Sequence, residues 1–246
     1  MAKAPKTAYV CNDCGAEFSR WQGQCSACKA WNTISEVRLI SASNSTKNDR
    51  FSGYAGETRA KIQTLSEISL QETPRFTSGF KELDRVLGGG IVPGSAILIG
   101  GHPGAGKSTL LLQVMCGLAK NMTALYVTGE ESLQQVAMRA NRLNLPTDKL
   151  NMLSETSVEQ ICNLADQLKP QIIVVDSIQV MHLSDIQSSP GSVAQVRECA
   201  SFLTRYAKTR QVAIIMVGHV TKDGTLAGPK VLEHAIDCSL LLEGEA

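Results

Sequence analysis

The 246-residue sequence predicts an α/β protein in which a mostly parallel sheet is covered by helices on both faces, preceded by a small four-cysteine module. Three observations lead to this prediction. Short, near-continuous apolar runs alternate with helical segments in the larger, C-terminal part of the chain. A glycine-rich loop joins one apolar run to a helix. Two Cys-x-x-Cys pairs lie close together near the N-terminus.

The alternating elements can be placed along the chain by their periodicity. The expected strands are residues 95–100, 124–128, 150–153, 171–176, 212–217 and 238–243. The expected helices are residues 77–87, with Ser78 as the cap, and residues 110–120, 131–142, 158–168 and 192–209. Right-handed crossovers between parallel strands bring the loops that follow the strands to one edge of the sheet, where ligands bind.

The glycine-rich loop reads G-x-x-x-x-G-K-S, the pattern of a phosphate-binding P-loop. Glycines let successive backbone N–H groups converge on phosphate oxygens, and the following helix adds its positive N-terminal end. Lys107 brings a charge to the β- and γ-phosphates, and the Ser108 hydroxyl is placed to ligate Mg²⁺. This predicts a site for ATP or ADP with Mg²⁺, in which Lys107 is also catalytic. The expected nucleotide-binding residues are Gly101, His102, Pro103, Gly104, Ala105, Gly106, Lys107, Ser108 and Thr109.

Polar side chains follow three other predicted strands. Asp176 ends the Ile-Ile-Val-Val run and is expected to hold Mg²⁺ together with Ser108, although strand ends also carry aspartates as helix caps. Glu130 and Glu131 follow the 124–128 strand, and either carboxylate can orient the attacking water. We favour Glu130 because it lies nearer the strand end. His219 follows the 212–217 strand, as a sensor of the γ-phosphate or as a histidine that merely forms a hydrogen bond there.

The N-terminal cysteines predict a zinc site. Each C-x₂-C pair forms a tight knuckle, and two knuckles supply the four thiolates of a closed, structural site. A redox pair or free thiols are the alternatives. We expect Trp21 and Trp31 to pack against the knuckles, and metal binding to supply most of the folding energy, on the order of ten kcal/mol. The four predicted ligands are Cys11, Cys14, Cys25 and Cys28.

Composition divides the chain further. Residues 1–34 form the zinc module, the polar residues 35–62 form a linker, and residues 63–246 form the second domain. The first 62 residues contain nine Lys/Arg and five Asp/Glu, so their charge of +4 leaves −3 for the remainder of a chain with a net charge of +1. A whole-protein basic footprint for nucleic acid is therefore absent.

No apolar run is long enough to span a membrane and no secretion signal is present, so we expect a cytoplasmic protein.

Two polar loops leave the nucleotide edge, at residues 181–191 and 221–230. Arg197, Lys222 and Lys230 are the candidates for contact with a phosphate backbone, although any one of them can equally be a solvated surface residue. With only four Tyr, five Phe and two Trp in the chain, we expect backbone tracking rather than a platform for base stacking.

The combination of motifs resembles the bacterial RadA/Sms family of recombination and repair proteins. It comprises the cysteine module, Leu-Gly-Gly-Gly-Ile-Val-Pro-Gly-Ser before the P-loop, Tyr-Val-Thr-Gly-Glu-Glu-Ser at residues 126–132, and Val-Gly-His-Val-Thr-Lys-Asp-Gly at residues 217–224. The resemblance covers essentially the whole chain. It implies a RecA-like ATPase core, a hexameric ring, and ATP-driven movement on single-stranded DNA that promotes branch migration alongside a RecA-type recombinase. The resemblance assigns the base role to Glu130. It also implies that His219 and residues 221–230 are functional.

The sequence also departs from this family. A Lys-Asn-Arg-Phe-Gly motif and a Lon-protease-like domain that follow the core in family members are absent, so the chain resembles a C-terminally truncated member. A nucleotide-gated oligomerising or binding module without motor activity is the main alternative function. A zinc-ribbon adaptor with a scaffold-like ATPase domain is the third.

Overall fold

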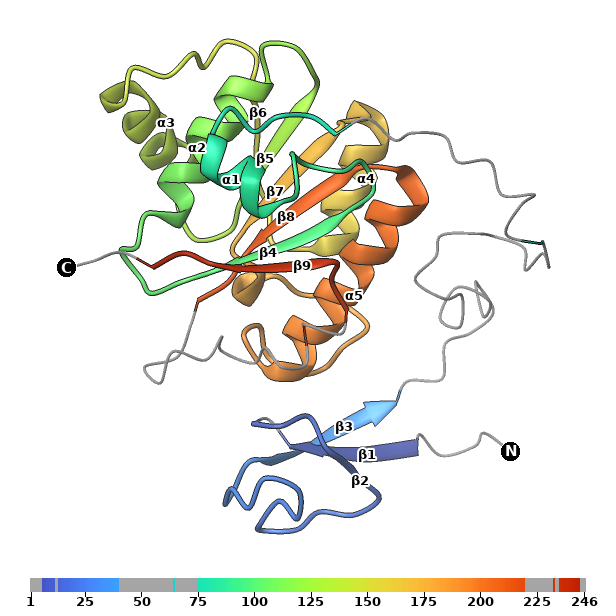
Figure 1. Ribbon diagram of the computed structural model, residues 1–246. Helices are drawn as coiled ribbons and strands as arrows, with labels where there is room; N and C mark the ends of the chain where they lie inside the picture. The colour runs from blue at the N-terminus through green and yellow to red at the C-terminus, as the bar shows by residue number, and fades with distance from the viewer. Residues whose placement is uncertain are drawn as a thin grey trace.

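The computed structural model describes residues 6–11, 13–39, 64, 75–219, 232 and 235–243. These residues form a small antiparallel sheet near the N-terminus and a larger parallel sheet flanked by helices (Figure 1). The architecture agrees with the predicted fold class. The predicted loop 221–230 lies outside the described residues.

The small sheet is built from three strands in the order β2-β1-β3: β1 (Lys6–Cys11), β2 (Glu17–Phe18) and β3 (Ile34–Leu39). Strand β3 pairs with β1 along its whole length, so the module continues past residue 34 into the segment predicted as a linker. Residues 40–62 of that segment lie outside the described residues. The buried core consists of Cys11, Cys25 and Ile34, which is too little apolar area to hold a fold by itself.

The larger sheet has six strands in the order β6-β5-β7-β8-β4-β9, and every pairing is parallel. All residues of β4, β5, β7 and β8 are buried, as expected for strands covered on both faces. Strand β8 separates β7 from β4, so their ends lie two positions apart at the sheet edge. The strands are β4 (Ala96–Gly100), β5 (Ala124–Thr128), β6 (Asn151–Ser154), β7 (Ile172–Asp176), β8 (Ala213–Val217) and β9 (Cys238–Leu241).

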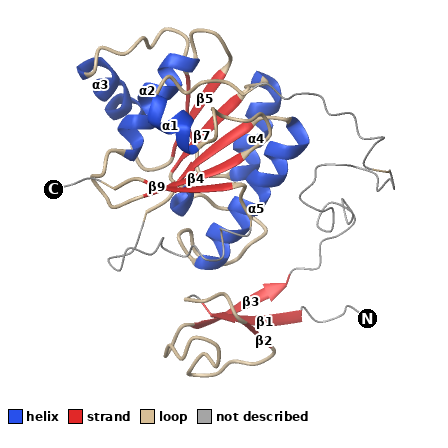
Figure 2. Cartoon of the chain, viewed as in Figure 1, coloured by secondary structure: helices blue, strands red, loops and turns tan. Residues whose placement is uncertain are grey.

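Helices cover both faces of this sheet (Figure 2). Alternate strand residues feed two cores: Ile97 and Ile99 pack on the side of α1, α2 and α3, whereas Ala96 and Leu98 pack on the side of α4 and α5. The chain continues from β7 into a 3₁₀ turn, η2 (Ile178–Val180). The helices are α1 (Lys81–Val86), α2 (Lys107–Leu118), α3 (Leu133–Arg142), α4 (Val158–Leu168) and α5 (Val193–Arg210).

Three helix starts differ from the prediction by two residues or more. Helix α2 begins at Lys107, within the P-loop motif, rather than at residue 110. Helix α1 begins at Lys81 without a side-chain cap, so the prediction of Ser78 as its cap is wrong; the Ser78 hydroxyl instead accepts a hydrogen bond from the backbone of Phe80 in the preceding turn. Helix α3 begins at Leu133, because Ser132 and Gln135 form a reciprocal capping box. This leaves Glu130 and Glu131 in the loop that follows β5.

The remaining cysteines behave as small apolar residues. Cys116, Cys162 and Cys199 are buried, and burial raises the pKa of each thiol. Among the helices within the described ranges, none combines the length and the apolar character that a membrane span requires.

Candidate nucleotide site and metal centre

The P-loop lies between β4 and α2, and Lys107 is the first residue of the helix. Its side chain is only 4% exposed, and Nζ donates hydrogen bonds to the carbonyl oxygens of Gly101 (2.6 Å) and His102 (2.8 Å). Burial lowers the pKa of Lys107, while the charges of Asp176 and Glu130 act in the opposite direction. The loop therefore curls around an ammonium group that faces two carboxylates.

Backbone geometry explains why two positions of the loop are occupied by glycine. Gly106, the N-cap of α2, has φ 90°, a left-handed conformation that strains residues with a Cβ atom. At Gly101, a Cβ atom would lie 2.5 Å from the carbonyl oxygen of Leu242, which passes beside the loop after β9. The fold therefore requires glycine at these two positions in addition to any requirement of phosphate binding.

Asp176, at the end of β7, lies beside Ser108 as the sequence predicts for two magnesium ligands. Its carboxylate accepts hydrogen bonds from the Ser108 hydroxyl and, at 2.6 Å, from the hydroxyl of Tyr126. Burial raises the pKa of Asp176, those two hydrogen bonds oppose the rise, and the nearby Glu130 and Glu131 add to it. A buried carboxylate beside a hydroxyl is a hard-oxygen donor set suited to Mg²⁺, which would neutralise charge on the bound phosphates.

Glu130 and His219 meet at the same edge. His219 Nε2 lies 3.0 Å from Oε1 and 3.3 Å from Oε2 of Glu130. The buried Ser177 hydroxyl also donates a hydrogen bond to Glu130 Oε1. His219 Nδ1 is buried without a partner among the described residues. The predicted base and the predicted sensor are therefore in direct contact.

Glu131 is held differently. Its Oε1 accepts a hydrogen bond of 2.8 Å from Arg139 Nη1 on α3, and its backbone is fixed by the Thr128 hydroxyl. Because an arginine already neutralises Glu131, the geometry favours Glu130 as the carboxylate available to a water molecule.

Sequence reasoning missed Tyr126 and Ser177. The hydroxyl of Tyr126 lies in a fully buried strand, and burial followed by the neighbouring Asp176 charge raises its pKa. A tyrosine inside an otherwise aliphatic strand is a usable signal, because buried hydroxyls require a partner. Ser177 carried no comparable signal beyond its position next to Asp176.

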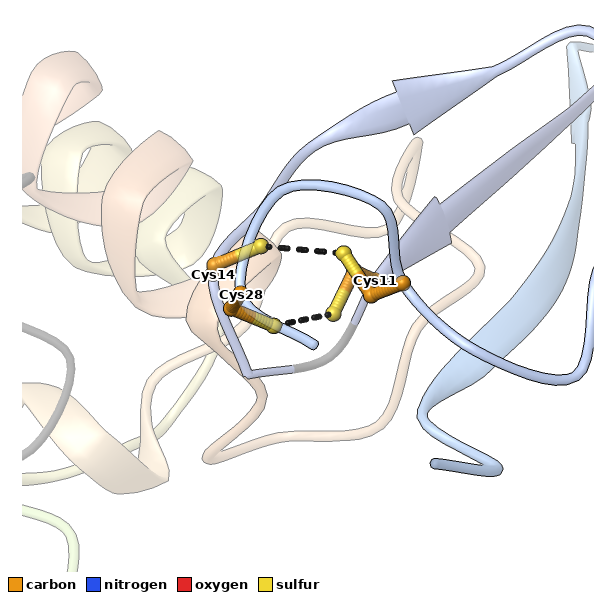
Figure 3. A group of neighbouring side chains, drawn as sticks. Cys11, Cys14 and Cys28 are labelled. Carbon is orange, nitrogen blue, oxygen red and sulfur yellow. Dashed lines mark hydrogen bonds between the residues drawn. The ribbon is translucent and has the colours of Figure 1, made fainter. Parts of the chain in front are cut away.

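The four N-terminal thiols converge as predicted (Figure 3). The Sγ atoms of Cys11 and Cys28 lie 3.7 Å apart, and those of Cys14 and Cys25 lie 3.5 Å apart. A tetrahedral zinc site with Zn–S bonds of about 2.3 Å requires sulfurs about 3.8 Å apart. The cluster therefore fits a closed zinc site in which the ion would cross-link both knuckles.

The metal-free thiols differ in their acidity. Burial favours the protonated form of Cys11, but hydrogen bonds from Thr33 and from backbone groups outweigh it and lower its pKa to about 6. Burial instead raises the pKa of Cys14 to about 12. The pocket thus already stabilises one thiolate.

The structure gives less support to the predicted DNA contacts than to the nucleotide and zinc sites. Arg197, in the first turns of α5, forms an ion pair of 3.1 Å with Glu198 and approaches Gly15 in the first knuckle, where a Cβ atom would lie 3.6 Å from its Nη1. Lys222 and Lys230 lie outside the described residues. The 181–191 loop is anchored by the buried Gln195, whose amide bonds to the backbone of Leu183 and Ser188.

Known proteins share both parts of this arrangement. Residues 59–225 match the AAA domain family, and residues 9–36 match a rubredoxin metal-binding domain. A KaiC-like protein from Pyrococcus horikoshii shares the fold of the larger part, with a TM-score of 0.57 at 18% identity over 69% of this chain and 80% of that one.

Curated relatives match along the full length of the chain. Proteins named DNA repair protein RadA are 94% identical in Haemophilus influenzae and 73% identical in Escherichia coli, in each case over 100% of this chain and 54% of the relative. The chain thus spans about half the length of these relatives and is similar to their N-terminal half. With a family match over more than half of its residues and a P-loop in the expected position, the chain belongs to the AAA domain family.

Proposed function

We propose that the chain is the ATP-hydrolysing part of a DNA repair protein, in which ATP turnover drives movement on single-stranded DNA and promotes branch migration. The observation that carries this proposal is the convergence of the P-loop, the magnesium pair and the Glu130–His219 pair at one edge of the sheet. The names of the relatives supply the link to DNA repair.

The roles follow from the contacts. The backbone of residues 101–106 and the Lys107 ammonium would bind the phosphates, and Ser108 and Asp176 would hold Mg²⁺. Glu130 would accept the proton of the attacking water or orient it. His219 would report the γ-phosphate to residues 220–231, because it connects Glu130 to the start of that segment.

The partners in this proposal come from the family resemblance and the relatives. They are single-stranded DNA, a RecA-type recombinase, and further copies of the chain in a hexameric ring. The cofactors are ATP or ADP, Mg²⁺ and a structural Zn²⁺.

The test measures ATP turnover, with and without single-stranded DNA, in the wild-type protein and in three single variants. Lys107→Ala is expected to abolish nucleotide binding and DNA-stimulated ATP turnover. Glu130→Gln is expected to preserve ATP binding while lowering turnover by about a hundredfold or more, as for the loss of a general base. Turnover that survives Lys107→Ala would refute the proposal, and full activity of Glu130→Gln with loss in Glu131→Gln would move the base role to Glu131.

A nucleotide-gated binding module is the second candidate, and one observation favours it. Glu130 is hydrogen-bonded to both His219 and Ser177, so a change at Glu130 on nucleotide binding can be passed on through these contacts without hydrolysis. Single-turnover hydrolysis that changes oligomeric state or DNA affinity without strand movement would support this candidate over the motor.

A further inference from the structure

The chain contains two tryptophans, and both are exposed on the cysteine module. Trp21 is 58% exposed and Trp31 is 69% exposed, so the expectation that they pack against the knuckles is wrong. The buried core of the module consists of Cys11, Cys25 and Ile34, and neither indole is part of it. Two large aromatic side chains in water call for an explanation in terms of binding.

The fold brings these two rings together. Gln24 pairs with Trp31 in an antiparallel bridge, and the backbone N–H of Asn32 donates to the carbonyl oxygen of Gly23 at 2.8 Å. A Cβ atom on Gly23 would lie 3.8 Å from Trp21 Cη2 and 3.9 Å from Trp31 Cζ3. The two indoles therefore converge above a glycine that has no side chain to separate them.

The charges around the pair select its partner. Arg20 precedes Trp21, Lys29 lies two residues before Trp31, and both are exposed. Residues 1–62 carry a charge of +4, whereas the remaining residues carry −3. Exposed indoles with exposed cationic residues next to them in the sequence suit unpaired bases on a phosphate backbone, because stacking needs bases that are free of a duplex and cations neutralise phosphates.

We propose that Trp21 and Trp31 form a stacking site for single-stranded DNA on the zinc module, with Arg20 and Lys29 meeting the phosphates. This site is separate from the nucleotide edge and does not depend on ATP hydrolysis. It also replaces the expectation, drawn from the low aromatic content, that the chain tracks DNA through backbone contacts alone. Two rings are sufficient for a small site when both lie on one surface.

The experiment uses the only two tryptophans of the chain as reporters. The zinc-loaded 246-residue protein is titrated with an oligothymidylate of about 20 nucleotides, longer than the site of a small single-strand-binding module. Stacking is expected to quench the tryptophan emission. Trp21→Leu and Trp31→Leu are each expected to weaken binding on the order of tenfold, measured by the anisotropy of labelled DNA at constant salt. Trp31→Phe, which retains a ring, is expected to bind more tightly than Trp31→Leu.

Controls separate this site from the rest of the molecule. Zinc content measured on each variant shows that the module is still folded, and duplex DNA of the same length is expected to leave the emission unchanged. Lys107→Ala is expected to lose ATP binding but keep the quenching, so a failure of the proposed ATPase and a failure of the stacking site are distinguishable. Emission that stays constant while labelled DNA saturates the protein, or Trp→Leu variants that bind normally, would overturn the proposal. An emission change seen only with an added protein would also overturn it and assign the pair to a protein contact.

Discussion

At the residue scale, each of the three carboxylates at the nucleotide edge has its own partner. Asp176 receives the Tyr126 hydroxyl, Glu130 contacts His219, and Glu131 is bound by an arginine. Three ionised carboxylates so close together repel one another, and a hydrogen-bond donor or a cation beside each opposes that repulsion. The separate partners let each carboxylate have a distinct function, so removing one partner is expected to affect one function.

Tyr126→Phe tests this for magnesium. Burial raises the pKa of Asp176, and the Tyr126 hydrogen bond opposes that rise, so losing the hydroxyl raises the pKa further. Only the ionised carboxylate holds Mg²⁺ well, so magnesium affinity falls as the pH drops through this pKa, and in the variant the fall begins at a higher pH. We expect the Mg²⁺ concentration that supports half-maximal ATP binding to rise about tenfold, the usual effect of losing a group that orients a metal ligand.

Tyr206→Phe is the matched control for this substitution. Its hydroxyl donates to Asp166 at 2.9 Å on the surface of α5 and α4, away from the nucleotide edge. The same chemical change is therefore expected to leave the Mg²⁺ titration unchanged. A Tyr126→Phe protein with the wild-type Mg²⁺ and pH dependence would show that Asp176 needs no support from β5.

At the scale of elements, periodicity and end signals were sufficient to predict most helices and strands. The strands β4, β5, β7 and β8 are mainly aliphatic runs buried on both faces, and such runs can be recognised in the sequence without knowledge of their neighbours. The order of the strands could not be predicted, because strands that are distant in sequence, such as β4 and β8, are neighbours in the sheet. Strands β5 and β7 are also neighbours, and the contact of Tyr126 with Asp176 depends on their pairing, so it could not be predicted from either strand alone.

The cysteine module shows the same limit. Spacing alone predicted the four thiol ligands, because a C-x₂-C pair is a local geometry. The exposure of the tryptophans depends instead on how the whole module packs, which spacing does not encode. A small metal-stabilised module can expose aromatic rings that a larger domain would bury.

The loop after η2 supplies a prediction about a single element. Gln195 is 2% exposed, and its side chain bonds to backbone groups of three loop residues, at 3.0 Å to Leu183 N, 3.0 Å to Ile186 O and 3.0 Å to Ser188 O. Gln195→Leu keeps the volume but leaves these groups unpaired, at a cost of about 1–3 kcal/mol for each group that stays buried. We expect faster hydrogen exchange in residues 183–191 with ATP binding unchanged.

Gln160→Leu is the control, since Gln160 is exposed in the first turn of α4. It is expected to leave exchange in the loop at the wild-type rate. Unchanged protection of the Leu183 amide in Gln195→Leu would mean that the loop is ordered by contacts other than this glutamine.

At the scale of the whole molecule, the two sheets have separate sources of stability. The module relies on its metal, whose binding is worth on the order of ten kcal/mol in small zinc domains, because its own apolar core is three residues. The parallel sheet relies on two apolar cores that contain no residue of the module. A ligand that binds one folded part stabilises that part alone unless the two unfold together.

Calorimetry of the zinc-loaded protein is therefore expected to show two unfolding transitions, one that responds to zinc and one that responds to the nucleotide. A zinc-selective chelator should remove the transition of the module, because its thiols lose the cross-link that holds the knuckles together. Mg²⁺ with ADP at a hundred times its Kd should stabilise the other transition by about 2.7 kcal/mol and raise its midpoint. Lys107→Ala should lose the shift caused by the nucleotide but keep the zinc-dependent transition. Arg197 and Val193 of α5 both lie beside Gly15 of the module, and this approach can couple the two parts. A single transition that responds to both the chelator and the nucleotide would show that the module and the parallel sheet unfold as one cooperative unit.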